Sequence, residues 1–104
     1  MTRDTLRVYL HNEPLMAVIK AKSEIDEIRK SLREALQIME ETNISKEACA
    51  EVQAKITEYG NISRGYGIML EDTFKVTWQA EAVIRQYPDC TDEEIDALPA
   101  KLSF

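Results

Sequence analysis

Apolar residues recur between Val18 and Met39 at alternating intervals of three and four positions. The full series is Val18, Ala21, Ile25, Ile28, Leu32, Ala35 and Met39. This heptad repeat keeps one narrow apolar stripe facing a partner helix along its whole length. Because no glycine or proline occurs between Leu15 and Tyr59, the pattern predicts a long helix over Glu13–Glu41. Asn12, followed by Glu13 and Pro14, is a typical start for such a helix.

A second heptad series begins after this helix and ends where the glycines begin. Its members are Cys49, Val52, Ile56 and Tyr59, which predict a shorter helix over Lys46–Tyr59. All three glycines fall within Gly60–Gly67. We therefore expect the helix to stop at Gly60, and we expect short loops at residues 42–45 and 60–63. Ser45 and Ser63 are the predicted caps of the helices that follow these loops.

A broad apolar face predicts a further long helix from Ser63 to Tyr87, and Pro88 ends it because proline cannot continue the helical hydrogen bonds. The residues of this face are Ile62, Tyr66, Met69, Leu70, Phe74, Val76, Ala80, Val83, Ile84 and Tyr87. Thr91 and Glu94 form a capping-box pattern, which predicts a short acidic helix over Thr91–Leu98.

The first residues, Thr2–His11, fit either of two patterns, because their apolar positions match both strand alternation and one face of a helix. With no second strand candidate to pair with, we expect a short helix or an extended arm. The predicted fold class is therefore all-α. We expect a small helical bundle with two long antiparallel helices, one shorter helix and a short acidic C-terminal helix, forming one domain over residues 1–104.

Composition and charge narrow the classes of partner. The chain is 44% hydrophobic and 31% charged, with a net charge of −6. Residues 47–104 hold eleven acidic and five basic side chains and account for this whole excess. An acidic chain repels phosphate backbones, so we do not expect nucleic-acid binding. Since no signal peptide and no long apolar run is present, we expect a cytoplasmic protein without membrane contact.

The residues that most often carry chemistry are few and scattered. His11, Cys49 and Cys90 lie too far apart in sequence to indicate a metal site. Neighbouring acids such as Glu93 and Glu94 point in different directions on a helix, so they do not form an acid–base pair. We therefore expect no enzymatic activity and no cofactor.

Two kinds of binding residue remain as candidates. The heptad series Val18, Ala21, Ile25, Ile28, Leu32, Ala35 and Met39 is the candidate interface, and we expect it to join two copies of the chain as a homodimer. An alternative is an anion site between subunits. Its candidate residues are Lys22, Arg29, Arg33, Arg64 and Tyr66.

The leading functional hypothesis is a non-enzymatic protein that binds another protein. The acidic second half and the surplus of apolar helical faces are typical of a small acidic inhibitor, an immunity-type protein or an adaptor, as phages and plasmids often encode. The alternative hypothesis, based on the anion site, is an oligomeric binder that sequesters an anionic metabolite or a nucleotide.

Overall fold

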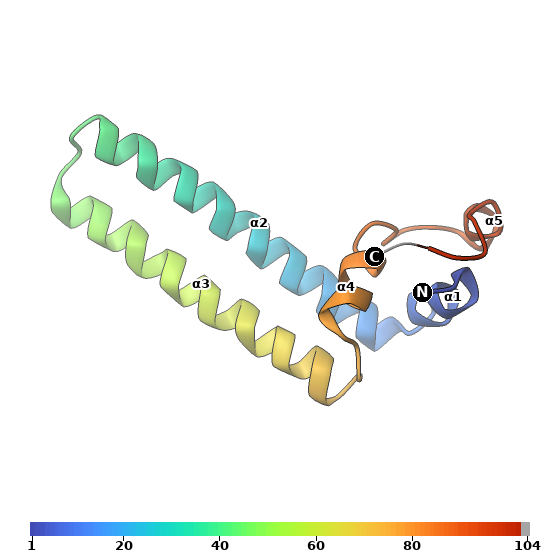
Figure 1. Cartoon of the computed structure of the whole chain (residues 1–104). Coiled ribbons are helices and arrows are strands. Elements are labelled where there is room, and N and C mark those ends of the chain that lie inside the picture. Colours follow the sequence, from blue (N-terminus) through green and yellow to red (C-terminus); the bar gives the residue numbers. More distant parts are fainter. Residues whose placement is uncertain (103–104) are drawn as a thin grey trace. The chain divides into compact units, whose positions relative to one another are not determined.

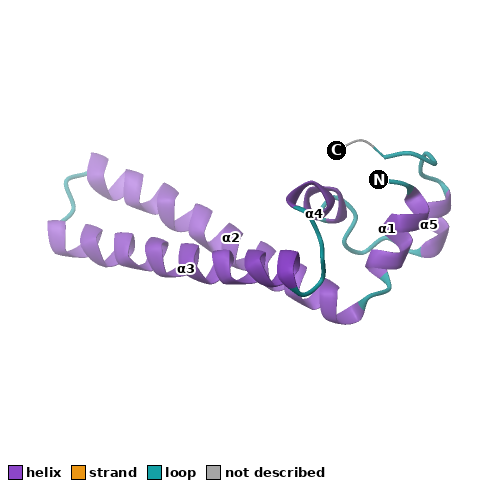
Figure 2. Cartoon of the chain, turned by 60° about the horizontal axis from the view of Figure 1, so that its bottom comes forward, coloured by secondary structure: helices purple, strands orange, loops and turns teal. Residues whose placement is uncertain are grey.

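The computed structural model describes residues 1–102, which form helices joined by loops (Figures 1 and 2). The helices are α1 (Arg3–Leu10), α2 (Glu13–Glu41), α3 (Lys46–Asp72), α4 (Trp78–Ile84) and α5 (Asp92–Asp96). Within this range no strand is present, and the one β-type contact is an isolated bridge between Thr2 and Lys101. Figure 1 shows α2 and α3 running side by side in opposite directions. The predicted all-α fold is therefore confirmed.

The helices begin where short polar side chains cap them. The Asn12 side chain accepts a hydrogen bond from the Leu15 N–H (3.1 Å), and the Ser45 hydroxyl accepts one from the Ala48 N–H (3.2 Å). Thr91 and Glu94 form the predicted capping box at the start of α5. These contacts satisfy N–H groups that have no partner within the helix. The predicted range of α2, Glu13–Glu41, is confirmed, and Thr2–His11 contains the helical alternative, α1.

Helix α2 ends in a Schellman motif. Asn43 has a positive φ of 57°, and the Ile44 N–H donates back to the Met39 carbonyl over 2.9 Å. Asparagine is one of the few residues other than glycine that tolerate this left-handed conformation. The predicted loop at residues 42–45 is therefore confirmed.

The predicted helix stop at Gly60 is wrong, because α3 continues through all three glycines to Asp72. None of the glycines has a positive φ, so none of them acts as a helix terminator. The half-buried positions of the second heptad series continue at Ser63 and Tyr66 and reach the buried Leu70. A seam that extends past Gly60 favours one continuous helix, and Ser63 lies inside it as a helical residue and not as a cap.

The predicted helix from Ser63 to Tyr87 is also wrong, since α3 ends at Asp72 and α4 begins at Trp78. The linking segment contains three β-branched residues, Thr73, Val76 and Thr77, which have low helix propensity. Lys75 has a positive φ of 58°, and the Thr77 side chain caps α4 by accepting from the Ala80 N–H (3.2 Å). This turn leaves Ile62 and Met69 exposed, while Val76 is buried.

The chain divides into two compact units. The core unit comprises Met1–Ala21 and the chain from Ile68 onward, and the hairpin unit comprises Lys22–Gly67. One apolar cluster holds the core unit together. Its buried members are Leu6, Leu15, Met16, Ile19, Leu70, Val76, Ala80, Val83, Ile84 and Leu102.

Paired charges join α1 to α5 within the core unit. Arg7 forms an ion pair with Asp96, and the His11 Nε2 lies 2.8 Å from the Asp92 carboxylate. The Arg3 guanidinium donates to the Leu98 carbonyl over 2.9 Å. Residues four apart on a helix share a face, so the basic row Arg3, Arg7 and His11 meets the acidic row Asp92 and Asp96.

Burial differs strongly between the two units. In the hairpin unit, Ile56 is the only buried apolar residue, with 4% of its surface exposed. The other positions at which α2 faces α3 within this unit, such as Ile25, Leu32 and Val52, are half-buried. A two-helix pair encloses little of its own seam, so the seam residues other than Ile56 keep part of their surface open to solvent.

Among the described residues, no helix has the length and apolar character needed to cross a lipid bilayer.

Candidate functional site

Polar residues occupy one end of the seam between the two helices of the hairpin unit. The Asp26 carboxylate accepts a hydrogen bond from the Ser63 hydroxyl (2.6 Å) and lies 3.4 Å from the Lys22 ammonium group. The Arg29 Nε donates to the main-chain carbonyl of Ile56 (3.1 Å). We call Lys22, Asp26 and Arg29, with the α3 residues that face them, the polar layer.

One glycine of α3, Gly60, makes room for a large side chain of this layer. A Cβ atom on Gly60 would lie 2.9 Å from the nearest guanidinium nitrogen of Arg29, and one on Gly67 would lie 3.7 Å from the Cε of Lys22. Gly60 and Gly67 are one heptad apart, as are Lys22 and Arg29. Of the two glycines, only Gly60 has a contact that a Cβ would make too close, because 3.7 Å is an ordinary van der Waals distance.

The predicted interface series is divided between two environments. Ile25, Leu32 and Met39 are half-buried, whereas Ile28 and Ala35 are exposed. Three further half-buried positions of α2 alternate with Ile25, Leu32 and Met39. They are Lys22, Arg29 and Leu36, which directly follow Ala21, Ile28 and Ala35 in sequence. One edge of the predicted stripe thus faces α3, and its other edge remains on the surface. Val18 and Ala21, both half-buried, belong to the core unit.

The exposed edge borders a shallow groove of about 450 Å³ on one side of the hairpin unit. This groove is lined by Leu32, Glu51, Val52, Ala54 and Lys55. Ile28 and Ala35 lie one turn before and after Leu32, and Ile62 lies two turns after Lys55, so helical spacing places all three on the same side. We call the groove together with Ile28, Ala35 and Ile62 the Leu32 face. Ile28 is 44% exposed and Ile62 39%.

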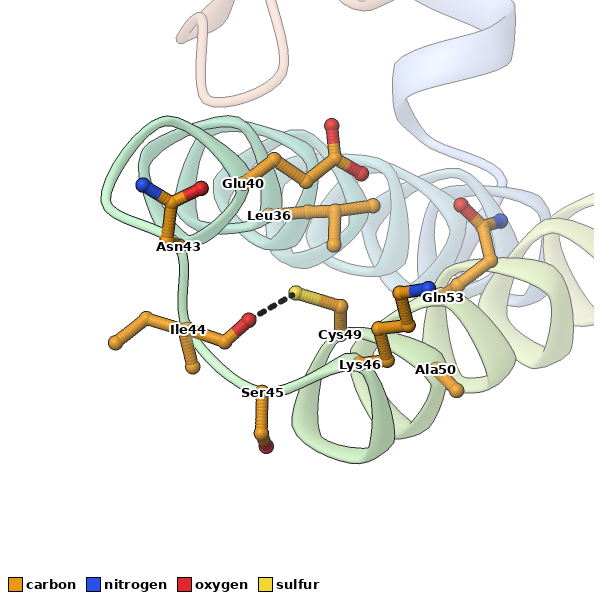
Figure 3. A pocket seen from close by; sticks show the side chains of 9 residues that line it. All are labelled: Leu36, Glu40, Asn43, Ile44, Ser45, Lys46, Cys49, Ala50 and Gln53. Carbon is orange, nitrogen blue, oxygen red and sulfur yellow. Dashed lines mark hydrogen bonds between the residues drawn. The ribbon is translucent and has the colours of Figure 1, made fainter.

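A second open depression, of about 670 Å³, lies beside the turn between α2 and α3. Figure 3 shows the side chains that line it, with the Cys49 thiol directed at the Ile44 carbonyl over 3.9 Å. Its other lining residues are Leu36, Glu40, Asn43, Ser45, Lys46, Ala50 and Gln53. One carboxylate, one ammonium group and one thiol without a neighbouring base do not form a catalytic arrangement.

The structure brings together only some of the candidate anion-binding residues. Lys22 and Arg29 lie in the polar layer, where Asp26 and a carbonyl oxygen already engage them. Arg33 and Arg64 are exposed, and Tyr66 is half-buried. The space beside Gly60 is taken by the Arg29 guanidinium.

No group of three or more His, Cys, Asp or Glu side chains suited to a metal ion occurs among the described residues. In the core unit, partial burial raises the pKa of the Cys90 thiol, with smaller contributions from Glu94 and Asp89. A raised pKa keeps this thiol protonated and poorly nucleophilic. The hydrogen bond with His11 lowers the pKa of Asp92, and this exposed pair links α1 to α5.

Sequence reasoning missed the Leu32 face because Ile62 was assigned to the apolar face of a helix predicted from Ser63 to Tyr87. It was therefore not expected on the same helix as Lys55. The signal that locates this face is the continuous heptad from Cys49 to Leu70. The heptad shows which side of α3 faces α2, and therefore which residues of α3 remain on the surface.

The chain matches no protein-family model, no curated protein and no solved structure.

Proposed function

We propose that this chain is a non-enzymatic protein that binds another protein through the Leu32 face. The observation that carries the proposal is the exposure of Ile28 and Ile62 beside the groove, on a hairpin that has only one buried apolar residue of its own. Apolar residues that gather on one surface of a small protein mark interaction sites. An inhibitor, an immunity-type protein or an adaptor in the cytoplasm is the class of function that fits such a surface.

Self-association through the predicted series, as a homodimer, has less support than the binding of another protein. Ile25, Leu32 and Met39 are already half-buried against their own hairpin. Only Ile28 and Ala35 of the hairpin-unit members of the predicted series stay exposed for a second copy. Two alternating exposed positions, one of them alanine, offer little area for a homodimer.

Sequestration of an anionic metabolite or nucleotide has the weakest support. Its two central cations, Lys22 and Arg29, have partners inside the chain. An anion at this place would have to replace the hydrogen bond from Arg29 to the Ile56 carbonyl and the Lys22–Asp26 ion pair.

Affinity capture with the full chain as bait tests the main proposal. The variant Ile28→Gln/Ile62→Gln removes two anchors of the Leu32 face and keeps helix-compatible residues. Thr57→Gln/Asn61→Gln is the matched control, since both positions are exposed on α3 but lie away from the groove. Circular dichroism confirms that both variants are folded.

We expect a protein from the lysate of the source cells to be retained by the wild type and by the control. Recovery with Ile28→Gln/Ile62→Gln should fall at least tenfold, as measured by quantitative mass spectrometry. Equal recovery with all three baits would contradict the proposal, because binding would then not use the Leu32 face.

A further inference from the structure

Three arginines lie on the flank of the hairpin unit opposite the Leu32 face. The inward positions of α2 form two rows: Leu32 borders the groove, whereas Arg29 belongs to the row on the other side of the seam and lies against Gly60. Arg33 follows Arg29 by one turn of α2, and Arg64 follows Gly60 by one turn of α3. Helical spacing therefore places all three side chains on the same flank. We call Arg29, Arg33 and Arg64 the arginine row.

The central member of this row, Arg29, is held in place by the chain itself. Its Nε donates to the Ile56 carbonyl over 3.1 Å, and its guanidinium fills the space that Gly60 leaves. The two terminal nitrogens of this guanidinium have no hydrogen-bond partner among residues 1–102. A guanidinium that is already fixed through one nitrogen loses little freedom when the other two bind a ligand.

The charges of the row have no counter-ions within the chain. Arg33 and Arg64 are exposed, and neither forms an ion pair with another residue of the described range. One turn before or after these arginines on either helix, the only carboxylate is that of Asp26. Asp26 is itself engaged by Lys22 and Ser63. Three cations thus gather without a carboxylate of their own, in a chain whose net charge is −6.

The outer side of α2 does not extend this basic surface. Glu27 and Glu34 follow the helical repeat onto the side of α2 that faces away from α3, and Lys30 lies one turn from each of them. These three residues leave one surplus negative charge there. The basic surface is therefore confined to the flank where α2 and α3 meet.

From this arrangement we infer that the arginine row is a second binding surface, whose occupant is a short acidic segment of another protein. Arginine binds carboxylates through pairs of parallel hydrogen bonds. Arg29 and Arg33 are about 6 Å apart along the helix axis, and acidic residues at alternate positions of an extended chain are about 6.6 Å apart. Two such carboxylates can therefore meet Arg29 and Arg33 together, with Arg64 beside them.

A nucleic acid is a poorer occupant of the row. Its phosphates continue beyond three arginines, and a chain of net charge −6 repels a long polyanion. A second copy of the chain is also disfavoured, because the acidic residues Asp92 and Asp96 are paired with His11 and Arg7 of their own α1. A short segment with two or three carboxylates matches the extent of the row.

Two short fluorescent peptides test the inference. One alternates Glu with Ser and the other alternates Gln with Ser, so they differ only in charge. Binding to the full chain is measured by the fluorescence anisotropy of the label, at low salt and at about 0.5 M salt, where charges are screened within a few ångströms. Inorganic phosphate and a short DNA duplex serve as competitors.

We expect the Glu peptide to bind at least tenfold more tightly than the Gln peptide at low salt, and we expect the difference to shrink as salt is added. Arg33→Gln/Arg64→Gln should weaken binding of the Glu peptide about tenfold. Lys55→Gln/Lys75→Gln changes the net charge equally, but Lys55 lines the groove of the Leu32 face and Lys75 belongs to the core unit. This control should bind like the wild type.

A further pair of variants tests the fixed position of Arg29. Gly60→Ala places a Cβ where the guanidinium lies, so it should weaken binding of the Glu peptide about threefold. Gly65→Ala, whose Cβ meets no atom within 4 Å, should leave the affinity unchanged. The same affinity in both variants would contradict the role given to Arg29.

Equal affinity for the two peptides, an equal loss with both glutamine variants, or no binding of the Glu peptide overturns the inference. So does tighter binding of phosphate or of the DNA duplex than of the Glu peptide. Ile28→Gln/Ile62→Gln should bind the Glu peptide like the wild type, because the two surfaces are separate. If affinity capture depends on Ile28 and Ile62 while the Glu peptide is not bound, the inference fails and the proposed function stands.

Discussion

Gly60 lies in the interior of α3, where a glycine normally destabilises a helix because it leaves the unfolded chain more freedom. Its missing side chain is the space through which the Arg29 guanidinium reaches the Ile56 carbonyl. Gly65, by contrast, has no atom within 4 Å of the place where a Cβ would stand. These two glycines, five residues apart in one helix, separate the effect of space from the effect of helix propensity.

Replacement of each glycine by alanine should therefore give different results. Gly65→Ala should raise the free energy of unfolding by about 0.5–1 kcal/mol, the gain in helix propensity. Gly60→Ala should be close to neutral, because the new Cβ displaces Arg29 and forfeits a hydrogen bond of about 0.5–1.5 kcal/mol. Urea unfolding measures both values.

Repeating the two substitutions in an Arg29→Ala background supplies the control. Without the guanidinium, Gly60→Ala should stabilise as much as Gly65→Ala does. A persistent difference between the two positions would mean that contact with Arg29 does not explain the effect of Gly60→Ala on stability.

The two non-glycine residues with positive φ, Asn43 and Lys75, differ in how well they tolerate it. Lysine has no side-chain compensation for the left-handed conformation, whereas asparagine does. Lys75→Gly should raise the free energy of unfolding by about 0.5–1 kcal/mol, since relief of strain exceeds the added freedom of the unfolded chain. Asn43→Gly should raise the free energy of unfolding by a smaller amount. Urea unfolding measures both values. An equal or larger effect at Asn43 would contradict this reasoning.

At the scale of elements, short α5 owes its position to its charges as well as to buried Ile95. Asp92 and Asp96 face His11 and Arg7 of α1, so the acidic cluster near the C-terminus serves both the helix dipole of α5 and a contact with α1. The sequence explains the first role through the capping box. The second role depends on which element α5 meets, and no local pattern carries that information.

The Asp92–His11 contact predicts a dependence of stability on pH. The hydrogen bond with His11 lowers the pKa of Asp92 from its ordinary value of 3.8. Asp92 therefore contributes stability that is fully present above that value and is lost as the pH falls through the lower pKa of the folded state. In Asp92→Asn this contribution is absent, so the difference in Tm from the wild type should shrink below about pH 4.

Glu93→Gln serves as the control for this pH series, because Glu93 shares the first turn of α5 with Asp92 and has no contact with His11. Its Tm difference from the wild type should reflect the helix dipole alone and be smaller at neutral pH. If Asp92→Asn and Glu93→Gln gave the same profile, the His11 contact would have no measurable effect.

How far the helices are predictable differs between their beginnings and their ends. Asn12, Ser45 and Thr91 identify helix starts correctly because capping is a local interaction. The predicted stop at Gly60 is wrong because a residue of another helix, Arg29, determines what Gly60 does. The break between α3 and α4 has only a weak local signal, the β-branched residues that follow Asp72. Burial of Val76, which depends on the rest of the core unit, also favours the break.

At the scale of the whole molecule, the two units differ in how much apolar surface they bury. The core unit contains the whole apolar cluster around Leu6 and Leu15, whereas Ile56 is the single buried apolar residue of the hairpin unit. Segments with few buried contacts open at a lower free-energy cost than a well-packed core. The hairpin unit should therefore be the less stable part of the chain.

Hydrogen exchange measures this difference directly. Amides of α2 beyond Lys22 and of α3 before Gly67 should exchange at least tenfold faster than those around Ile19 and Ile84. Binding of a partner to the Leu32 face should slow exchange in the hairpin unit and leave the core unit nearly unchanged. Uniform protection across both units of the free protein would contradict the prediction.

The candidate site was only partly visible in the sequence. The heptad series identifies the stripe that contains Ile28, Leu32 and Ala35, but it does not show which edge faces α3. The structure resolves this because Lys22, Arg29 and Leu36 take the inward positions, and Gly60 leaves the space that the Arg29 guanidinium fills. Two polar residues at inward positions run against the usual preference for apolar ones, so pattern alone favours the other choice.

The heptad spacing of the inward positions of α2 and α3 has a consequence for the length of the hairpin. Arg29 meets Gly60 near one end of the hairpin, and the Asn43 turn closes the other. Between them the inward positions of both helices recur every seven residues. Insertion of seven residues into α2 and seven into α3 at the same level would lengthen the arm by about 10 Å and leave both ends in register. Insertions of unequal length would not. The length of the hairpin can thus change in steps of one heptad while the two helices keep their register.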